Sequence, residues 1–136
     1  HMSDQVIATE TDLTRALFSS RPEAEAVIAW RDNAAVGFAL YFQSFSTFVG
    51  RPGLYLEDLF VRPVYRRRGI GRQLLAHLAQ LAVARGCGRF EWSVLTWNKL
   101  AIGIYEKVGA SSMNDWTVYR LSGNALSALA SETQPT

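Results

Sequence analysis

The stretch that decides the fold is Val61-Arg62-Pro63-Val64-Tyr65-Arg66-Arg67-Arg68-Gly69-Ile70-Gly71-Arg72. It follows a strand-like segment, 54–61, and opens a helix-like one, 69–85, in which apolar residues recur at helical spacing. At a helix start the backbone N–H groups point outward without partners, and the helix dipole adds partial positive charge. Gly69 and Gly71 carry no side chains, so an anion can come close to the backbone. Together with the arginines, the stretch predicts a site for a diphosphate.

Two other interpretations of this basic stretch stay open. It can be a solvated basic turn before an ordinary helix, or its arginines can bind RNA. RNA binding is typically supported by stacking aromatic side chains, and here only Tyr65 is adjacent. The whole chain has 14 basic and 12 acidic residues, a net charge of +2 that does not by itself indicate a nucleic acid or a membrane as partner. Five arginines within eleven residues after a strand favour the diphosphate.

The remaining elements predict a mixed α/β domain. Segments in which apolar and polar residues alternate indicate strands, and Arg31-Asp32-Asn33 is typical of a hairpin turn between two of them. A strand that directly follows a strand–helix pair is expected to lie parallel to the first strand. The sheet is therefore predicted to be mostly antiparallel with one parallel βαβ unit. The predicted elements are a helix over 9–19, strands over 26–30, 35–45 and 54–61, a helix over 69–85, a strand over 89–95, a helix over 98–108 and a strand over 116–121.

Length and composition point to one domain. The chain has 136 residues, and we expect the domain to cover 3–122, with a helical turn or two and a tail over 123–136. His1-Met2 is interpreted as a cloning remnant followed by the native start. Cys87 is the single cysteine and lies in a predicted turn, so neither an intrachain disulfide nor a cysteine nucleophile is expected. No signal peptide, long apolar run or metal site is predicted, and we expect a cytoplasmic protein.

Two motifs in the right order carry a family resemblance. Arg66-Arg67-Arg68-Gly69-Ile70-Gly71 matches a Gln/Arg-x-x-Gly-x-Gly/Ala signature. Downstream stands Trp97-Asn98-x-x-Ala101-x-x-x-Tyr105-x-x-x-Gly109-Ala110. Both motifs are similar to those with which the GNAT superfamily of N-acetyltransferases holds its cofactor. Over about residues 5–121 the chain resembles the polyamine (spermidine/spermine) and thialysine acetyltransferase branch, notably at 54–61 and 36–42.

The resemblance implies an acetyl-CoA-dependent enzyme that transfers acetyl to a primary amine of a small molecule by direct attack in a ternary complex. It implies that Tyr105 acts as general acid near the cofactor sulfur, and that Glu57 helps to remove the amine proton, directly or through water. For the cofactor, it implies that the backbone of Phe60 and Val61 pairs with the pantetheine arm, that Asn98 hydrogen-bonds that arm, and that Arg66, Arg67, Arg68, Gly69, Ile70, Gly71 and Arg72 hold the pyrophosphate. The residues expected at the acceptor are Glu57, Asp58, Phe48 and Trp116.

Several of these residues have a structural alternative. Tyr105 can be an aromatic at the edge of the core, and Trp116 can pack at the end of the sheet. Glu57 fits a structural ion pair as well as a catalytic role, because a buried carboxylate is costly unless it is paired. Regular strand alternation places Tyr55, Glu57 and Leu59 on one face of the sheet and Leu56, Asp58 and Phe60 on the other.

Two features depart from the family's pattern. Members usually carry a strand and a helix before the segment that starts here at Asp4. The polyamine enzymes of the branch carry an acidic residue and a tryptophan in the loop that matches 44–48, where this chain has no carboxylate. The first difference leaves a sheet edge and an apolar face exposed, so we expect a homodimer. The second weakens the assignment of a polyamine acceptor. A non-catalytic CoA-binding sensor or interaction module, and a peptide or protein N-acetyltransferase, stay open as alternatives.

Overall fold

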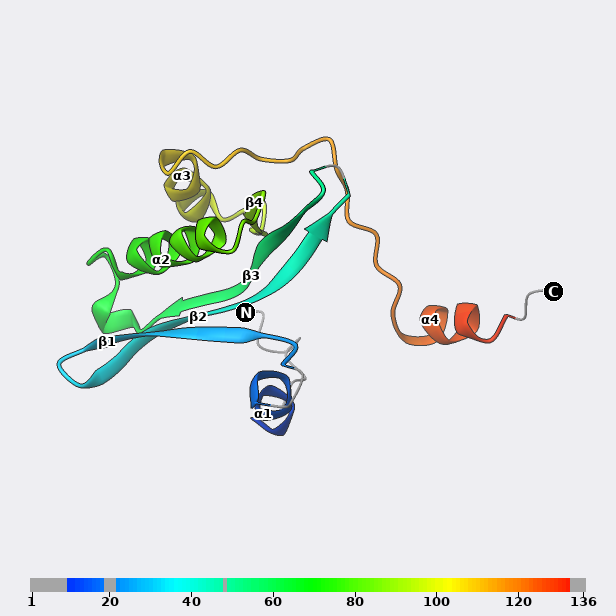
Figure 1. Ribbon diagram of the computed structural model, residues 1–136, viewed down its shortest axis with the longest axis horizontal. Helices are drawn as coiled ribbons and strands as arrows, with labels where there is room; N and C mark the ends of the chain where they lie inside the picture. Colours follow the sequence, from blue (N-terminus) through cyan, green and yellow to red (C-terminus); the bar gives the residue numbers. More distant parts are fainter. Residues whose placement is uncertain (1–9, 19–21, 48, 133–136) are drawn as a thin grey trace. The chain divides into compact units, whose positions relative to one another are not determined.

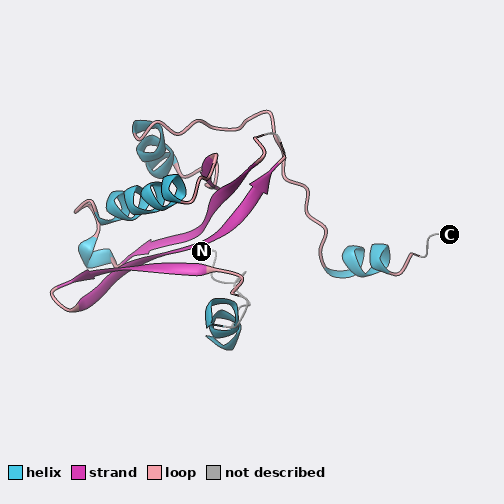
Figure 2. Cartoon of the chain, viewed as in Figure 1, coloured by secondary structure: helices cyan, strands magenta, loops and turns pink. Residues whose placement is uncertain are grey.

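Figures 1 and 2 show a computed structural model of the protein, which describes residues 10–18, 22–47 and 49–132. The backbone divides into two compact units, 1–93 and 94–136. No helix in the described ranges is long and apolar enough to cross a membrane. The first unit contains α1 (Glu10–Phe18), β1 (Glu25–Arg31), β2 (Ala34–Ser46), β3 (Arg51–Val61), the short 3-10 helix η2 (Pro63–Tyr65), α2 (Ile70–Ala84) and β4 (Arg89–Trp92). The second contains α3 (Lys99–Lys107) and α4 (Gly123–Ala130).

The four strands form one sheet in the order β1-β2-β3-β4. The pairs β1·β2 and β2·β3 are antiparallel, whereas β3 and β4 are parallel. Asp32 and Asn33 connect β1 to β2 with φ angles of 51° and 65°. Two positive φ angles are what a two-residue hairpin turn needs to match the twist of its strands, and Asn and Asp tolerate them. The predicted mixed sheet and its hairpin are confirmed.

One face of the sheet packs against α2 (Figure 1). Leu78 of α2 and Leu54 of β3 are both fully buried. Burying one such side chain contributes roughly 1.5–3 kcal/mol, so this apolar stripe is a main source of the unit's stability. The other buried apolar side chains are Val36, Ala39, Tyr41, Leu56, Val61, Ile70, Leu74, Leu75 and Ala82.

A bidentate ion pair joins the end of α2 to the start of β1. Arg85 Nη1 and Nη2 donate to the two carboxylate oxygens of Glu25 at 2.8 and 2.7 Å. The same guanidinium lies over the ring of Tyr41, 5.9 Å from its centroid. The hydrogen bond from Arg85 lowers the pKa of Glu25 below its ordinary value. The contact fixes β1 against the helix at a position where both side chains remain partly exposed.

A β-bulge interrupts β3 at Glu57. Leu40 pairs with Asp58 and Tyr41 pairs with Leu56, so Glu57 is an extra residue with no partner in β2. Leu56 is buried opposite Tyr41, on the face that meets α2, and Leu59 also lies on that face, 3.7 Å from the Cβ position of Gly71. The prediction that Leu56 shares a face with Asp58 and Phe60 is therefore wrong, because strict alternation does not hold across a bulge.

The second unit differs most from prediction. Residues 116–121, predicted as a strand, pair with no strand in the part of the chain that the structure describes. Val118 is 85% and Tyr119 is 94% exposed, so neither face of this segment is buried. A strand is stable only when a neighbour satisfies its backbone groups, and propensity alone does not supply one. The helical turns predicted after residue 122 extend to an eight-residue helix, α4, whereas β4 ends at Trp92 instead of 95.

Candidate functional site

The basic loop forms a concave backbone segment between η2 and α2. Arg67 has a φ of 64°, and Gly69, the N-cap of α2, has a φ of 81°. No side chain caps the helix, and Gln73 N–H donates to Gly69 O at 3.0 Å as the first helical hydrogen bond. The N–H groups of Ile70, Gly71 and Arg72 precede that bond and therefore point out of the helix start. This arrangement suits an anion.

Arg66 plays a different part from the other arginines of the loop. Its backbone N–H donates to Pro63 O at 3.2 Å, and its Nε donates to Val61 O at 2.8 Å. Its guanidinium lies 5.4 Å from the ring centroid of Phe60. These contacts tie the loop to the end of β3, so the Arg66 N–H is already used. The other exposed arginines of the loop are Arg67, Arg72 and Arg68, whose guanidinium lies 5.5 Å from the ring centroid of Tyr65.

Half of β3 has an open edge. β4 pairs only with Gly53–Leu56, and beyond Leu56 the segment 57–61 has no neighbour on that side among the described residues. A strand edge of this kind offers backbone N–H and C=O groups to an extended guest. The edge runs toward the basic loop, and the Arg66 contact with Val61 O marks its end. The first unit therefore joins an open edge to a turn whose backbone suits an anion.

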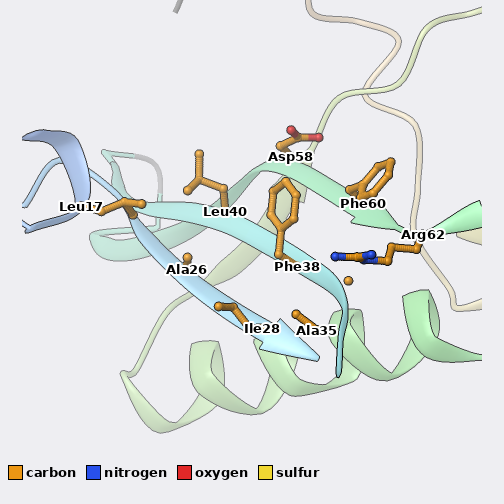
Figure 3. Close-up of a pocket in the computed structure, with 10 residues that line it drawn as sticks. Leu17, Ala26, Ile28, Ala35, Phe38, Leu40, Asp58, Phe60 and Arg62 are labelled. Atoms are coloured by element: carbon orange, nitrogen blue, oxygen red, sulfur yellow. The ribbon is translucent and has the colours of Figure 1, made fainter. Parts of the chain in front are cut away.

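A cavity of about 440 Å³ lies on the sheet face away from α2 (Figure 3). Its walls are apolar except for two charged side chains, Asp58 and Arg62. In Figure 3 the guanidinium of Arg62 points below Phe60 toward Phe38, and the carboxylate of Asp58 stands at the rim. The lining residues are Leu17, Ala26, Ile28, Ala35, Gly37, Phe38, Leu40, Asp58, Phe60 and Arg62.

The two predicted carboxylates of β3 occupy different positions. Asp58 lines the cavity, whereas Glu57, the exposed bulge residue, is not among its lining residues. Neither forms an ion pair with another residue that the structure describes. A structural ion pair for Glu57 is therefore not seen among the described residues. Phe48, also predicted at the acceptor, lies outside the described residues.

The remaining predicted site residues belong to the second unit. Asn98 is the N-cap of α3, and its Oδ1 accepts a hydrogen bond from Ala101 N–H at 3.2 Å. This cap uses the oxygen, so a contact with a ligand would fall to the Nδ2 amide group. Tyr105 lies on α3 and is half-buried, and burial raises the pKa of its hydroxyl above the ordinary 10.0. Trp116 is 64% exposed.

Sequence reasoning missed Arg62 and Phe38 as cavity residues. Arg62 belongs to the basic stretch of the sequence, but it precedes the turn, and its side chain lines the cavity. A usable signal existed in the alternation of β2, where Phe38 and Leu40 fall on one face. The register Phe38↔Phe60 and Leu40↔Asp58 places them beside the β3 residues of the cavity. That register depends on the bulge, which alternation does not reveal.

Comparison with known proteins agrees with this geometry. Residues 3–110 match the Acetyltransferase (GNAT) family. The chain is 34% identical over 140 residues to thialysine N-epsilon-acetyltransferase of Sus scrofa, covering 95% of this chain and 82% of that protein. It is 44% identical over 98 residues to L-ornithine N5-acetyltransferase of Arabidopsis thaliana, covering 72% of this chain but only 43% of the plant protein.

Among solved structures, the integron cassette protein VCH_CASS6 from the mobile metagenome of V. cholerae has a TM-score of 0.80 at 33% identity. The match covers 94% of this chain and 82% of that one. The family match spans most of the sequence, and the resemblance to the thialysine and polyamine branch that the motifs indicated is confirmed. The chain belongs to the GNAT family of acetyltransferases.

Proposed function

We propose that this protein is an acetyl-CoA-dependent N-acetyltransferase that acetylates a primary amine of a small molecule. One observation carries the proposal. The segment 57–61 of β3 has an open edge that leads to the basic loop, and its residues Asp58 and Phe60 line the apolar cavity. One strand segment thereby connects a surface suited to the cofactor with a surface suited to an acceptor.

The chain's residues fit acetyl-CoA. The outward N–H groups of Ile70, Gly71 and Arg72, with the exposed guanidinium groups of the loop, suit a pyrophosphate. The open edge at Phe60 suits the amide-containing pantetheine arm, which can add to it as a strand would. When bound, acetyl-CoA supplies an activated acetyl group as a thioester. Asn98 Nδ2 is proposed as a further donor to the pantetheine.

The acceptor is proposed to occupy the cavity beside β3. Asp58 is suited to hold an ammonium group, and the apolar walls are suited to an alkyl chain. Arg62 adds a positive group that favours an acceptor bearing a carboxylate. The two enzymes named above act on ornithine and thialysine, which are amino acids with a side-chain amine. An amino acid of this kind matches the pair Asp58 and Arg62 better than a polyamine, which has no carboxylate.

Two proton transfers are assigned to this chain's side chains. An amine is mostly protonated at neutral pH and must lose a proton before it attacks. Glu57, exposed on the bulge, is proposed to accept that proton, directly or through water. Tyr105 is proposed to donate its hydroxyl proton to the departing sulfur. Burial raises the pKa of that hydroxyl above 10.0, so the proton is present at neutral pH. No residue of the chain needs to become acetylated.

A thiol-release assay with a panel of amines tests the acceptor assignment. The panel contains ornithine and lysine analogues, their decarboxylated diamines, polyamines, aminoglycosides and peptides. The amino acids are expected to give higher kcat/KM than the matching diamines. Arg62→Met should remove this preference by raising the KM of the amino acids alone, while Arg51→Met, an equivalent change on an exposed arginine outside the cavity, should keep it. Equal kcat/KM for each amino acid and its diamine in the wild type would contradict the role of Arg62.

A further inference from the structure

Phe60 belongs to both surfaces of the proposed site. Its side chain lines the cavity and is 39% exposed. Its strand segment also carries the edge proposed for the pantetheine arm. In the proposed function, an amine in the cavity meets the thioester at that edge, so it has to pass the ring of Phe60. The orientation of this ring therefore bears on how the acceptor is held.

The backbone of Phe60 is fixed by its pairing with β2. Phe38 is its partner in the ladder, and two residues further on Arg62 N–H donates to Val36 O at 2.8 Å. The two strands lie close together here, since a Cβ on Gly37 would be 2.7 Å from Phe60 O. The ladder thus holds the main chain of Phe60, and the contacts of its side chain decide where the ring lies.

Two side chains contact this ring from opposite sides. On the β2 side, the ring of Phe38 lies 6.0 Å away between centroids, within the range of an aromatic pair (Figure 3). Because the N–H of Arg62 faces β2, the carbonyl of Val61 faces the other edge of β3, and there Arg66 Nε donates to it at 2.8 Å. The guanidinium of Arg66 lies 5.4 Å from the centroid of the Phe60 ring. The ring therefore lies between an aromatic neighbour and a cation.

The contacts of Arg66 differ from those of Arg68, which also places its guanidinium near an aromatic ring. The ring beside Arg68 is that of Tyr65, a residue of η2 that does not line the cavity. Arg66 instead contacts the main chain of β3 and a ring of the cavity wall with the same group. One side chain of the basic loop is thereby joined to the cavity.

We propose that Arg66 is a positioning residue for the acceptor, because it holds the ring of Phe60 in the cavity wall. This inference rests on the proposed function, which supplies the amine and the thioester. Without the guanidinium, the ring loses its neighbour on the outer side and is able to turn away from its place in the wall. The acceptor then meets a cavity of changed shape and binds more weakly. A residue of the cofactor motif therefore also affects the acceptor.

Steady-state kinetics tests this role with the amine of the panel that gives the highest kcat/KM. Arg66→Gln removes the cation but keeps an amide donor for Val61 O, and it should raise the acceptor KM about two- to fivefold, the strength of an exposed cation–π contact. Arg66→Lys keeps a cation for the ring and should recover part of that loss. Arg68→Gln is the matched control, since it removes the same charge and a similar contact from the same loop.

Arg68→Gln should leave the acceptor KM unchanged even where the KM for acetyl-CoA rises. An acceptor KM that rises equally in Arg66→Gln and Arg68→Gln, or in neither, overturns the proposal.

A second substitution shows whether Arg66 acts through the ring. Phe60→Leu keeps an apolar side chain but offers no ring to a cation. Adding Arg66→Gln to Phe60→Leu should therefore leave the acceptor KM where Phe60→Leu alone puts it. The same rise in both backgrounds would mean that Arg66 affects the acceptor without Phe60, which contradicts the proposal.

A measurement without substrate separates this inference from the proposed function. Urea unfolding of the wild type, Arg66→Gln, Phe60→Leu and the double variant gives the coupling between the two side chains. Arg66→Gln should lower the free energy of unfolding more in the wild type than in Phe60→Leu. Strictly additive changes overturn the proposal. Coupling in urea, together with no thiol release from any amine, contradicts the proposed function and leaves the contact between Arg66 and Phe60 in place.

Discussion

Gly69 carries the conformation on which the basic loop depends. Its φ of 81° lies in the left-handed region, where a Cβ costs about 1–2 kcal/mol. Replacing it with alanine either strains the loop or rotates the N–H groups of Ile70 and Gly71 away from a bound anion. The sequence pattern placed this glycine at the start of a helix after a strand, and its position as the N-cap of α2 agrees with that. Its role in binding the cofactor stays a prediction.

Gly69→Ala is expected to weaken acetyl-CoA binding at least tenfold by calorimetry. Gly50→Ala is the matched control, since Gly50 has a φ of 66°, has open space around its Cβ position and lies outside the loop. Both variants should lose a similar amount of stability, about 1 kcal/mol, because both place a Cβ at positive φ. Only Gly69→Ala should lose affinity. Normal affinity in Gly69→Ala would mean that the loop amides do not bind the cofactor.

A substitution at Tyr105 tests the proposed proton transfer separately from the binding of acetyl-CoA. Tyr105→Phe keeps the ring and removes the proposed acid, so kcat should fall about 100-fold while the KM for acetyl-CoA changes little. Because burial raises the pKa of the wild-type hydroxyl above 10.0, this group should add no pH dependence to kcat between pH 7 and 9. Near-normal kcat in Tyr105→Phe would show that the residue only packs at the edge of its helix.

At the scale of elements, the sequence was enough to predict the helices, the hairpin and the parallel β3·β4 pair. Apolar spacing in α2 and turn residues such as Asp32-Asn33 are local signals that need no knowledge of the partner. The sequence was not enough to predict the bulge at Glu57 or the absence of a strand over 116–121 among the described residues. The first depends on the register between two strands, and the second on whether any strand lies beside the segment.

The ion pair between α2 and β1 predicts a pH dependence of stability. The folded pKa of Glu25 is below its ordinary 4.5, so its stabilisation is fully present above pH 4.5 and is lost as the pH falls through the folded value. Both side chains are partly exposed, with Glu25 at 42%, so solvent screening keeps the contribution to about 0.5–1 kcal/mol.

Urea unfolding at several pH values measures this contribution. Glu25→Gln should be less stable than the wild type at pH 7 by that amount. The two free energies of unfolding should converge as the pH falls through the folded pKa of Glu25, because the wild-type carboxylate is then protonated. Glu91→Gln removes the ion pair with Arg89 on β4, in which Arg89 Nε lies 3.0 Å from Glu91 Oε1, and serves as the control. It should shift stability less, because the Arg85 pair is bidentate. A difference in stability that stays constant as the pH falls through the acid range would assign the effect to packing instead of charge.

For the whole molecule, the proposed cofactor surface is the part whose local backbone the sequence predicted most completely, whereas the roles of its residues stay predictions. Its loop and open edge lie in consecutive residues, so a motif can specify them. The cavity proposed for the acceptor combines side chains from α1, β1, β2 and β3, which only the folded sheet brings together. Phe38 and Arg62 are therefore structural findings. The roles of Asn98, Tyr105 and Trp116 stay predictions, since these residues belong to the second unit.

The most direct test of the proposed function is amine-dependent release of the cofactor thiol. Wild-type protein is mixed with acetyl-CoA, with and without ornithine and the other amines of the panel, and free thiol is followed over time. We expect steady release only when an amine is present, with one N-acetylated amine formed for each thiol. Tight binding of acetyl-CoA without release for any amine would contradict the enzyme and leave a CoA-binding module as the function of this fold.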